Sequence, residues 1–254
     1  MPSKKISDMT ALTSTATDDE FVVVDTDAGE TKRITSANLK TAMAPDAASA
    51  SAAGIVELAT TGEAETGTDT SRAVTAAGVK AAVTGTQDMW IPAAAMRPAA
   101  TNPCADIASV DSGGNSGPDL QVLDFDKDSD EHAQFSVAMP KSWDGGNITF
   151  SAYWVGLAST DGVAWGLQVK ALGDGEDINV AYGTAVVVTD DSQGSATEIN
   201  VSATSGTIAC SGAAGDILFC QILRDVSDGN DDMAGDARLV GIKINYTTDA
   251  TTDA

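Results

Sequence analysis

Acidic residues at alternate positions are the first group in the sequence whose types and spacing could do chemistry. Asp124, Asp126 and Asp128 stand at every second position in "DFDKDSDEH", and carboxylate oxygens are the ligands that Ca²⁺ prefers. The EF-hand pattern fails here, because Ser129 stands where Gly is required and Phe135 where a bidentate Glu is required. We expect solvated turns, and the alternative is a calcium site of another kind on the three Asp residues.

Aromatic side chains near acidic loops are the second group, because they could contact sugars. Strand parity places Trp154 with Phe150 and Trp165 with Leu167, so both indoles are expected in the core. Trp143, in the loop "PKSWDGG", and Tyr153, on the opposite face from Trp154, are the surface candidates for carbohydrate contact. A structural role for either residue is the alternative.

Residues for catalysis are scarce. His132 is the single histidine, and the sequence contains no Gly-x-Ser-x-Gly elbow and no zinc-protease motif. Paired carboxylates could hydrolyse glycans, but 37 acidic residues make chance pairing unavoidable. We therefore expect a protein that is not an enzyme and that needs no cofactor.

Charge and cysteine content exclude several classes of protein. The net charge of −23 disfavours binding to nucleic acids and to anionic membranes, and residues 88–254 carry 7 basic and 25 acidic side chains of the total. No apolar stretch is long enough for a secretion signal or a membrane span, so no membrane insertion is expected. Cys104, Cys210 and Cys220 are an odd number without C-x-x-C spacing, which favours buried free thiols.

Residues 88–254 have the pattern of a mainly β domain. Turn-rich segments such as "GDGED" and "DVSDGNDDMAGD" separate eight short apolar stretches, and no helix of useful length is evident. In "DILFCQIL" both faces are apolar, which is typical of a central strand or of a strand that meets another chain. We predict an antiparallel jelly-roll-like β-sandwich as the C-terminal domain.

The N-terminal part divides into two smaller regions. Residues 1–43 predict a small β-hairpin followed by a short helix capped by Thr35 or Ser36. Lys5–Thr41 in this region resembles an N-terminal segment common in phage structural proteins, which implies that residues 1–43 attach the chain to a virion. Residues 44–87 combine an Ala/Ser-rich linker with "GIVELATTGEAETGTDTSRAVTAAGVKAA". "ITSANLKTAM" and "VTAAGVKAAV" share a pattern at an offset of 40 residues, which indicates two related modules.

The stretch from Gly54 to Ala82 resembles the repeat of bacteriophage tail fibres. That repeat joins a Gly-[Ile/Val]-Val-x-Leu-Ala strand to a Glu, a Gly-Thr-Asp turn and an Ala-Val-Thr-x-x-x-[Leu/Val]-Lys helical end. The family usually has Pro and Leu where this sequence has Ala76 and Val79. The resemblance implies three chains wound together. It also implies a role in attachment or fibre assembly for the matched positions, which include Gly54, Val56, Leu58, Val74 and Thr75.

We therefore expect a bacteriophage virion structural protein, located on the exterior of the particle. It would be a short homotrimeric fibre or spike that projects its β-sandwich for host attachment and receptor binding. The expected partners are further copies of the chain, other virion proteins and a host glycan or protein. The alternatives are a head-decorating or tail-lattice protein without a receptor role, and a glycan-cleaving spike.

Overall fold

The computed structural model describes residues 14–46, 48–49, 54–111, 113, 116–250 and 252. The first 13 positions of the predicted N-terminal module lie outside the described residues. The chain divides into two compact units. One comprises Met1–Ala59 and Asp69–Ala73, and the other comprises Thr60–Thr68 and Val74–Ala254.

The first unit contains the predicted hairpin and short helix. Strands β1 (Glu20–Asp25) and β2 (Glu30–Thr35) pair antiparallel around a turn in which Gly29 has a φ of 64°. Helix α1 (Ser36–Met43) begins directly after β2, and the side chain of Thr35 accepts a hydrogen bond from the backbone N–H of Asn38. The predicted cap is thereby confirmed at Thr35, a residue type that satisfies the free N–H groups of a first helical turn.

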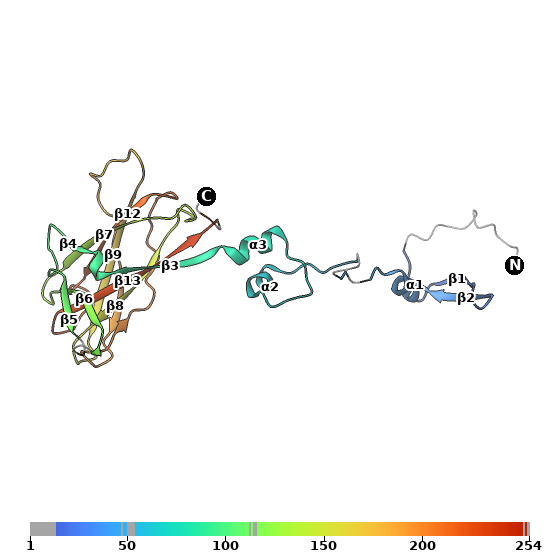
Figure 1. Ribbon diagram of the computed structural model, residues 1–254, viewed down its shortest axis with the longest axis horizontal. Helices are drawn as coiled ribbons and strands as arrows, with labels where there is room; N and C mark the ends of the chain where they lie inside the picture. Colours follow the sequence, from blue (N-terminus) through green and yellow to red (C-terminus); the bar gives the residue numbers. More distant parts are fainter. Residues whose placement is uncertain are drawn as a thin grey trace. The chain divides into compact units, whose positions relative to one another are not determined.

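The second unit begins with two short helices and continues into a β-sandwich (Figure 1). Each of the eight apolar stretches of the sequence overlaps one strand, and the mainly β, jelly-roll-like prediction is confirmed. The elements are α2 (Thr61–Thr66), α3 (Ala76–Val83), β3 (Gly85–Pro92), a 3-10 turn (Ala93–Ala95), β4 (Arg97–Pro98), β5 (Ala108–Asp111), β6 (Asp119–Phe125), β7 (Glu131–Ala138), β8 (Thr149–Val155), β9 (Gly162–Leu172), β10 (Val186–Asp191), β11 (Asn200–Val201), β12 (Ile217–Arg224) and β13 (Ala237–Thr248).

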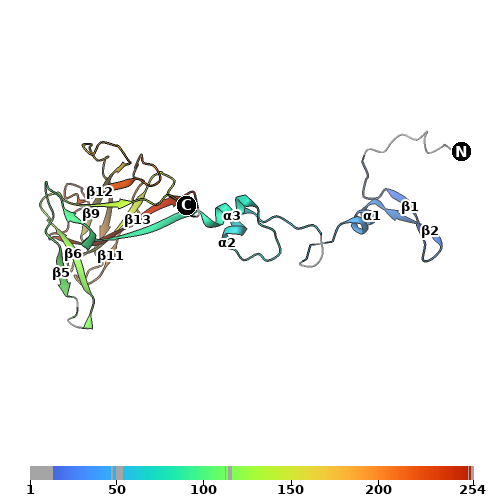
Figure 2. The same cartoon turned by 45° about the horizontal axis from the view of Figure 1, so that its top comes forward.

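Two antiparallel sheets make up the sandwich. The five-stranded sheet has the order β10-β9-β12-β7-β4. The six-stranded sheet has the order β11-β8-β13-β6-β5, and β3 pairs with the second half of β13. Figure 2 shows the β5–β6 hairpin together with β9, β12 and β13. Because β12 lies between β9 and β7, its doubly apolar pattern is that of a central strand, as one of the two interpretations predicted.

The core fills the space between the sheets with inward-facing side chains from alternate strand positions. Trp154 and Trp165 are both fully buried, which confirms the parity prediction for these two indoles. The ring of Trp165 packs edge-on against that of Phe125, with ring centroids 5.2 Å apart. The indole N–H of Trp154 donates to Asp190 at 2.7 Å, so the polar atom of this buried ring has a partner.

One buried cation fixes the long acidic loop after β12. The guanidinium of Arg224 is fully buried and donates to both carboxylate oxygens of Asp231. It also donates to the backbone carbonyl oxygens of Phe125, Met233 and Gly235. Five donors in a rigid fork match this set of acceptors, so the loop is held against the end of β12.

The three cysteines are free and buried, as the sequence predicted. Burial raises the pKa of the Cys104 thiol to about 12 and that of Cys210 to about 11. Burial also raises the pKa of Cys220 strongly. All three therefore remain protonated thiols near neutral pH, the form that reacts slowly with electrophiles.

Candidate functional site

An exposed tryptophan on strand β3 is the centre of the candidate site. Thr86, Asp88 and Trp90 alternate along β3 with Gln87, Met89 and Ile91, and successive strand side chains point to opposite faces. Ile91 is buried in the core, so Trp90 lies on the outer face of the six-stranded sheet. Its side chain is 46% exposed, whereas the other three tryptophans are at most 1% exposed.

Trp90 forms an aromatic pair with Tyr153 of β8. The ring centroids are 4.9 Å apart and the ring planes are at 83°, which is an edge-to-face arrangement. Such pairs are stabilised by the ring quadrupoles beyond their contact area. Because the rings are nearly perpendicular, a flat ligand that stacks on one ring meets the edge of the other.

A glycine in β13 makes room for the indole. Gly241 pairs with Tyr153 on one side and with Pro92 on the other, so it separates the two aromatic strands. A Cβ atom at Gly241 would lie 2.6 Å from ring atoms of Trp90, which means that the indole lies directly over this backbone. The pairing register shifts between Leu239 and Gly241, a β-bulge of the kind that redirects side chains at functional sites.

An open hollow of about 500 Å³ adjoins the aromatic pair. Ile199 and Val240 extend its apolar lining, and one ion pair supplies its charged groups. The ammonium of Lys243 is 3.1 Å from the carboxylate of Asp88, with the two side chains 33% and 53% exposed. An exposed pair of this kind contributes only about 0–1 kcal/mol, so both groups can exchange partners with a ligand at little cost.

Of the two predicted carbohydrate contacts, the structure places one at the surface and one in the core. Tyr153 is half-buried on the outer face, as predicted, and belongs to the aromatic pair. The prediction for Trp143 is wrong, because its side chain is only 1% exposed. Its backbone forms an isolated bridge with Thr248, and its indole packs beside Gly212, so the loop turns the ring inward to close one end of the sandwich.

Trp90 was missing from the predicted contacts, although the sequence holds a signal for it. In "TQDMWIP" the indole shares strand parity with Thr86 and Asp88, both polar, while Met89 and Ile91 share the opposite parity. An aromatic residue on the polar side of an amphipathic strand is expected to face solvent. The β3 segment lies at the predicted boundary of the sandwich, where no strand was expected.

The three predicted calcium ligands serve other partners. Asp124 accepts a hydrogen bond from Arg238 at 3.0 Å, and Asp126 accepts one from the backbone N–H of Asp128 at 2.6 Å. The carboxylate of Asp128 forms an ion pair with Lys127. Within the described ranges, no group of three or more His, Cys, Asp or Glu side chains is arranged to hold a metal ion. Asp126 and Asp128 lie in the connection between β6 and β7, as the turn interpretation expects, whereas Asp124 belongs to strand β6.

The segment that resembles a fibre repeat consists of turns, bridges and two helices. Leu58 forms a parallel bridge with Ala73 where the resemblance implied a strand. Thr75 caps α3 by accepting a hydrogen bond from Gly78, which places the helical end as implied. Gly54 is an exposed coil residue, and Val56, Leu58 and Val74 are 45–60% exposed.

Polar side chains organise the turns of this segment. Thr60 and Glu63 form a reciprocal capping box at the start of α2, and Gly67 ends that helix with a φ of 67°. Asp69 accepts hydrogen bonds from the backbone and side chain of Ser71, and these bonds lower its pKa to about 2. Gly67 and Thr75 therefore have local roles, the first at the end of α2 and the second as the cap of α3.

Comparison with known proteins gives matches among solved structures, each over about 60% of the chain. No protein family matches the chain, and no curated protein does. A family 35 carbohydrate-binding module from Clostridium thermocellum matches with 13% identity and a TM-score of 0.39, covering 62% of this chain and 97% of the module. A family 36 module of a xylanase from the hindgut metagenome of Trinervitermes trinervoides matches with 11% identity and a TM-score of 0.36. This match covers 62% of this chain and 96% of the module. A xylan-binding family 22 domain from Paenibacillus barcinonensis matches with 9% identity and a TM-score of 0.36. This match covers 60% of this chain and 92% of the domain.

The prediction of a bacteriophage fibre or spike needs correction at this point. The solved structures reported above are carbohydrate-binding modules, and none of these three is a virion protein. The described helices also include none that is long and apolar enough to span a membrane. The role as a virion protein was inferred from short Ala, Gly and Thr motifs, and two of those positions, Gly67 and Thr75, end one short helix and cap another.

Proposed function

We propose that this chain is a non-catalytic carbohydrate-binding protein, in which Trp90 and Tyr153 hold a neutral sugar ring on the outer face of the six-stranded sheet. The single observation that carries this function is the exposed indole of Trp90 beside Tyr153 and an open apolar hollow. Small-molecule sites combine such aromatic lining with a few polar groups that fix orientation.

The chemistry of the hollow matches a pyranose better than a purely apolar ligand. A sugar ring has a C–H face that can lie on an aromatic ring, and its hydroxyl groups need hydrogen-bond partners at the rim. The Asp88 carboxylate accepts and the Lys243 ammonium donates, and both lie beside Trp90 in the sheet. The rigid strand positions of Trp90 and Tyr153 lower the entropic cost of ordering the site.

Titration of the full chain with neutral oligosaccharides of xylose, glucose, mannose and galactose tests this function. Calorimetry measures the affinity, and tryptophan fluorescence reports on the indole. We expect at least one oligosaccharide to bind, and Trp90→Ala to weaken that binding roughly tenfold or more, equivalent to about 1.4 kcal/mol. Val22→Ala removes an apolar side chain of the first unit that is 76% exposed, and it serves as a control for the loss of surface apolar area.

Selective oxidation gives a second readout of the same site. N-bromosuccinimide attacks accessible indoles, and Trp90 is the one exposed tryptophan of the four. A bound neutral sugar should protect one indole from oxidation. The function is refuted if none of the four neutral series binds, or if Trp90→Ala binds them as tightly as the wild type.

Two earlier predictions remain open beside this function. Self-association into a trimer would cover the apolar side chains of Val56, Leu58 and Val74, which are exposed in the single chain. A host-surface glycan is one source of the proposed ligand. Neither is required for sugar binding by Trp90 and Tyr153.

A further inference from the structure

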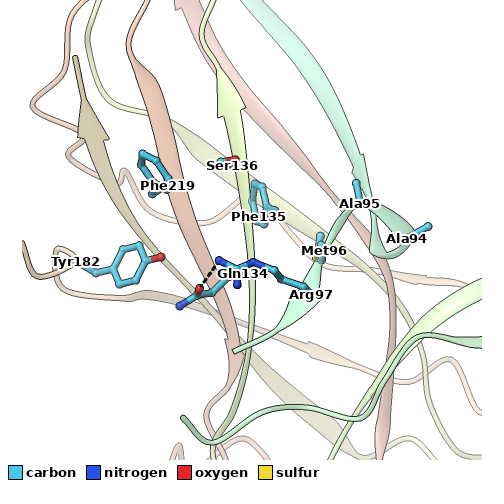
Figure 3. A pocket seen from close by; sticks show the side chains of 9 residues that line it. All are labelled: Ala94, Ala95, Met96, Arg97, Gln134, Phe135, Ser136, Tyr182 and Phe219. Carbon is cyan, nitrogen blue, oxygen red and sulfur yellow. Dashed lines mark hydrogen bonds between the residues drawn. The ribbon is translucent and has the colours of Figure 1, made fainter. Parts of the chain in front are cut away.

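The outer face of the five-stranded sheet carries a row of polar side chains that crosses four strands. Gln168 of β9 pairs in register with Gln221 of β12, Gln221 with Gln134 of β7, and Gln134 with Arg97 of β4. Gln168 donates to Gln221. The guanidinium of Arg97 donates to Gln134 at 3.3 Å, as Figure 3 shows. The row therefore places three amides and one cation side by side on a rigid surface.

Arg97 differs from every other arginine of this chain in its electrostatic surroundings. Arg33, Arg72, Arg224 and Arg238 each lie within 3.3 Å of a carboxylate oxygen. Arg97 is paired with no carboxylate among the described residues, although the chain contains 37 acidic side chains. Guanidinium groups bind carboxylates and other oxyanions through charge-assisted hydrogen bonds, so this one is available to a ligand.

The walls around Arg97 contain no acidic side chain. Two adjoining hollows, of about 240 and 190 Å³, share Tyr182 and Phe219. The first is lined by Arg97 with Gln134 and Ser136, and the second by Lys170 with apolar residues. In a protein of net charge −23, this surface with two cations and no carboxylate is a local reversal of sign that would attract an anion.

Tyr182 and Phe219 give the hollows an aromatic wall. Phe219 stands on β12 two residues before Gln221, on the same outer face. Tyr182 belongs to the segment between β9 and β10, which is attached to the edge of β9 by a hydrogen bond from Gly183 to Val169 of 3.1 Å. In Figure 3 the hydroxyl of Tyr182 points toward Gln134 and Arg97. An aromatic wall, amides and a cation are suited to a polyhydroxylated ring that carries an anionic group.

We infer that this face is a second binding site, which takes an acidic sugar unit whose carboxylate or sulfate group is bound by Arg97. Lys170 adds long-range attraction, and the amides of Gln134 and Gln221 bind hydroxyl groups. The site goes beyond the proposed function and shares with it only the assumption that the ligand is a saccharide. The two sites lie on opposite sheets, so one protein molecule could hold two different glycan segments.

The experiment uses the full chain and three probes with matched sugars. Oligogalacturonate carries carboxylates, sulfated galactose oligosaccharides carry sulfate esters, and neutral galactose oligosaccharides carry neither group. Calorimetry and NMR titration should detect binding of at least one anionic probe, with the neutral probe at least roughly tenfold weaker at this site. Which anionic probe binds more tightly identifies the oxyanion.

Variants then assign that binding to Arg97. We expect Arg97→Met to weaken the anionic probe roughly tenfold or more, while Arg97→Lys retains part of the affinity. Arg33→Met causes the same change in net charge at an arginine of the first unit and should have no effect. Lys170→Met provides a second variant in the same site, and thermal unfolding confirms that each variant is folded.

The outcomes separate this site from the one at Trp90. Trp90→Ala should leave binding of the anionic probe unchanged, and Arg97→Met should leave binding of neutral sugars unchanged. The second site is refuted if neither anionic probe binds, if Arg97→Met binds them like the wild type, or if acetate and sulfate ions bind as tightly as the sugars. If the anionic probe binds through Arg97 but no neutral sugar binds, only the proposed function is refuted.

Discussion

The two outer faces of the sandwich are built from the same kind of strand and present opposite chemistry. On the six-stranded sheet, Trp90 and Tyr153 form an aromatic surface whose one cation, Lys243, is neutralised by Asp88. On the five-stranded sheet, the row of amides ends at Arg97, a cation without a carboxylate partner among the described residues. Inward positions define the shared core, whereas outward positions are free to specify different ligands.

The largest expected effect tests whether the two faces depend on one core. Asp231→Ala leaves the buried guanidinium of Arg224 without its carboxylate partner, and breaking such a pair costs about 3–5 kcal/mol. We expect a marked fall in the melting temperature, with both binding activities lost in the same thermal transition. The control is Asp236→Ala, at an exposed aspartate of the same loop. If binding at one face were lost at a clearly lower temperature than binding at the other, the two faces would unfold independently.

A smaller effect, from a substitution at Gly241, should weaken binding at one face and leave the other face unchanged. In Gly241→Ala the new Cβ would meet the indole of Trp90 at 2.6 Å and the carbonyl oxygen of Ile91 at 2.6 Å, so the ring or the strand must shift. We expect a loss of about 1–3 kcal/mol in unfolding free energy, typical of overpacking, together with weaker binding of neutral sugars. Binding of acidic sugars should remain unchanged in calorimetry. Gly229→Ala, in the exposed loop after β12 with open space around it, is a control for the loss of a glycine.

The smallest effect concerns salt and requires no variant. Raising NaCl from about 50 to about 500 mM screens exposed charges, so affinity for acidic sugars should fall several-fold. Affinity for neutral sugars should change by less than about twofold, because stacking on Trp90 involves no net charge. Equal salt dependence at both faces would remove the electrostatic difference between them.

Much of the sandwich could be predicted because the core-facing residues repeat with the strand period. The apolar stretches gave the positions of β6 to β10, β12 and β13, and parity placed Trp154 and Trp165 inward. The stretch "EINVSATSGTIA" was less informative, since its ordered strand is only Asn200–Val201. Most of that segment does not pair as a regular β-strand, and the alternation of apolar residues in the sequence gives no sign of this.

The candidate sites were harder to predict because tertiary contacts decide them. Loop membership suggested an exposed Trp143, yet the ring is drawn into the end of the core beside Gly212. Alternating aspartates suggested calcium, yet Asp124 is paired with Arg238, which lies 114 residues later in the chain. Likewise, Arg97 becomes distinctive only when the positions of the carboxylates in space are known.

The buried cysteines have a practical consequence. Since Cys104, Cys210 and Cys220 are enclosed and remain protonated, a thiol-modifying reagent can reach them only when the sandwich opens. The rate of alkylation, followed by mass spectrometry, would then act as an internal clock for opening of the native state. Because Cys104 lies near Glu131 and Asp124 whereas Cys210 and Cys220 lie near each other, labelling of Cys104 before or after the other two would show which part of the sandwich opens first.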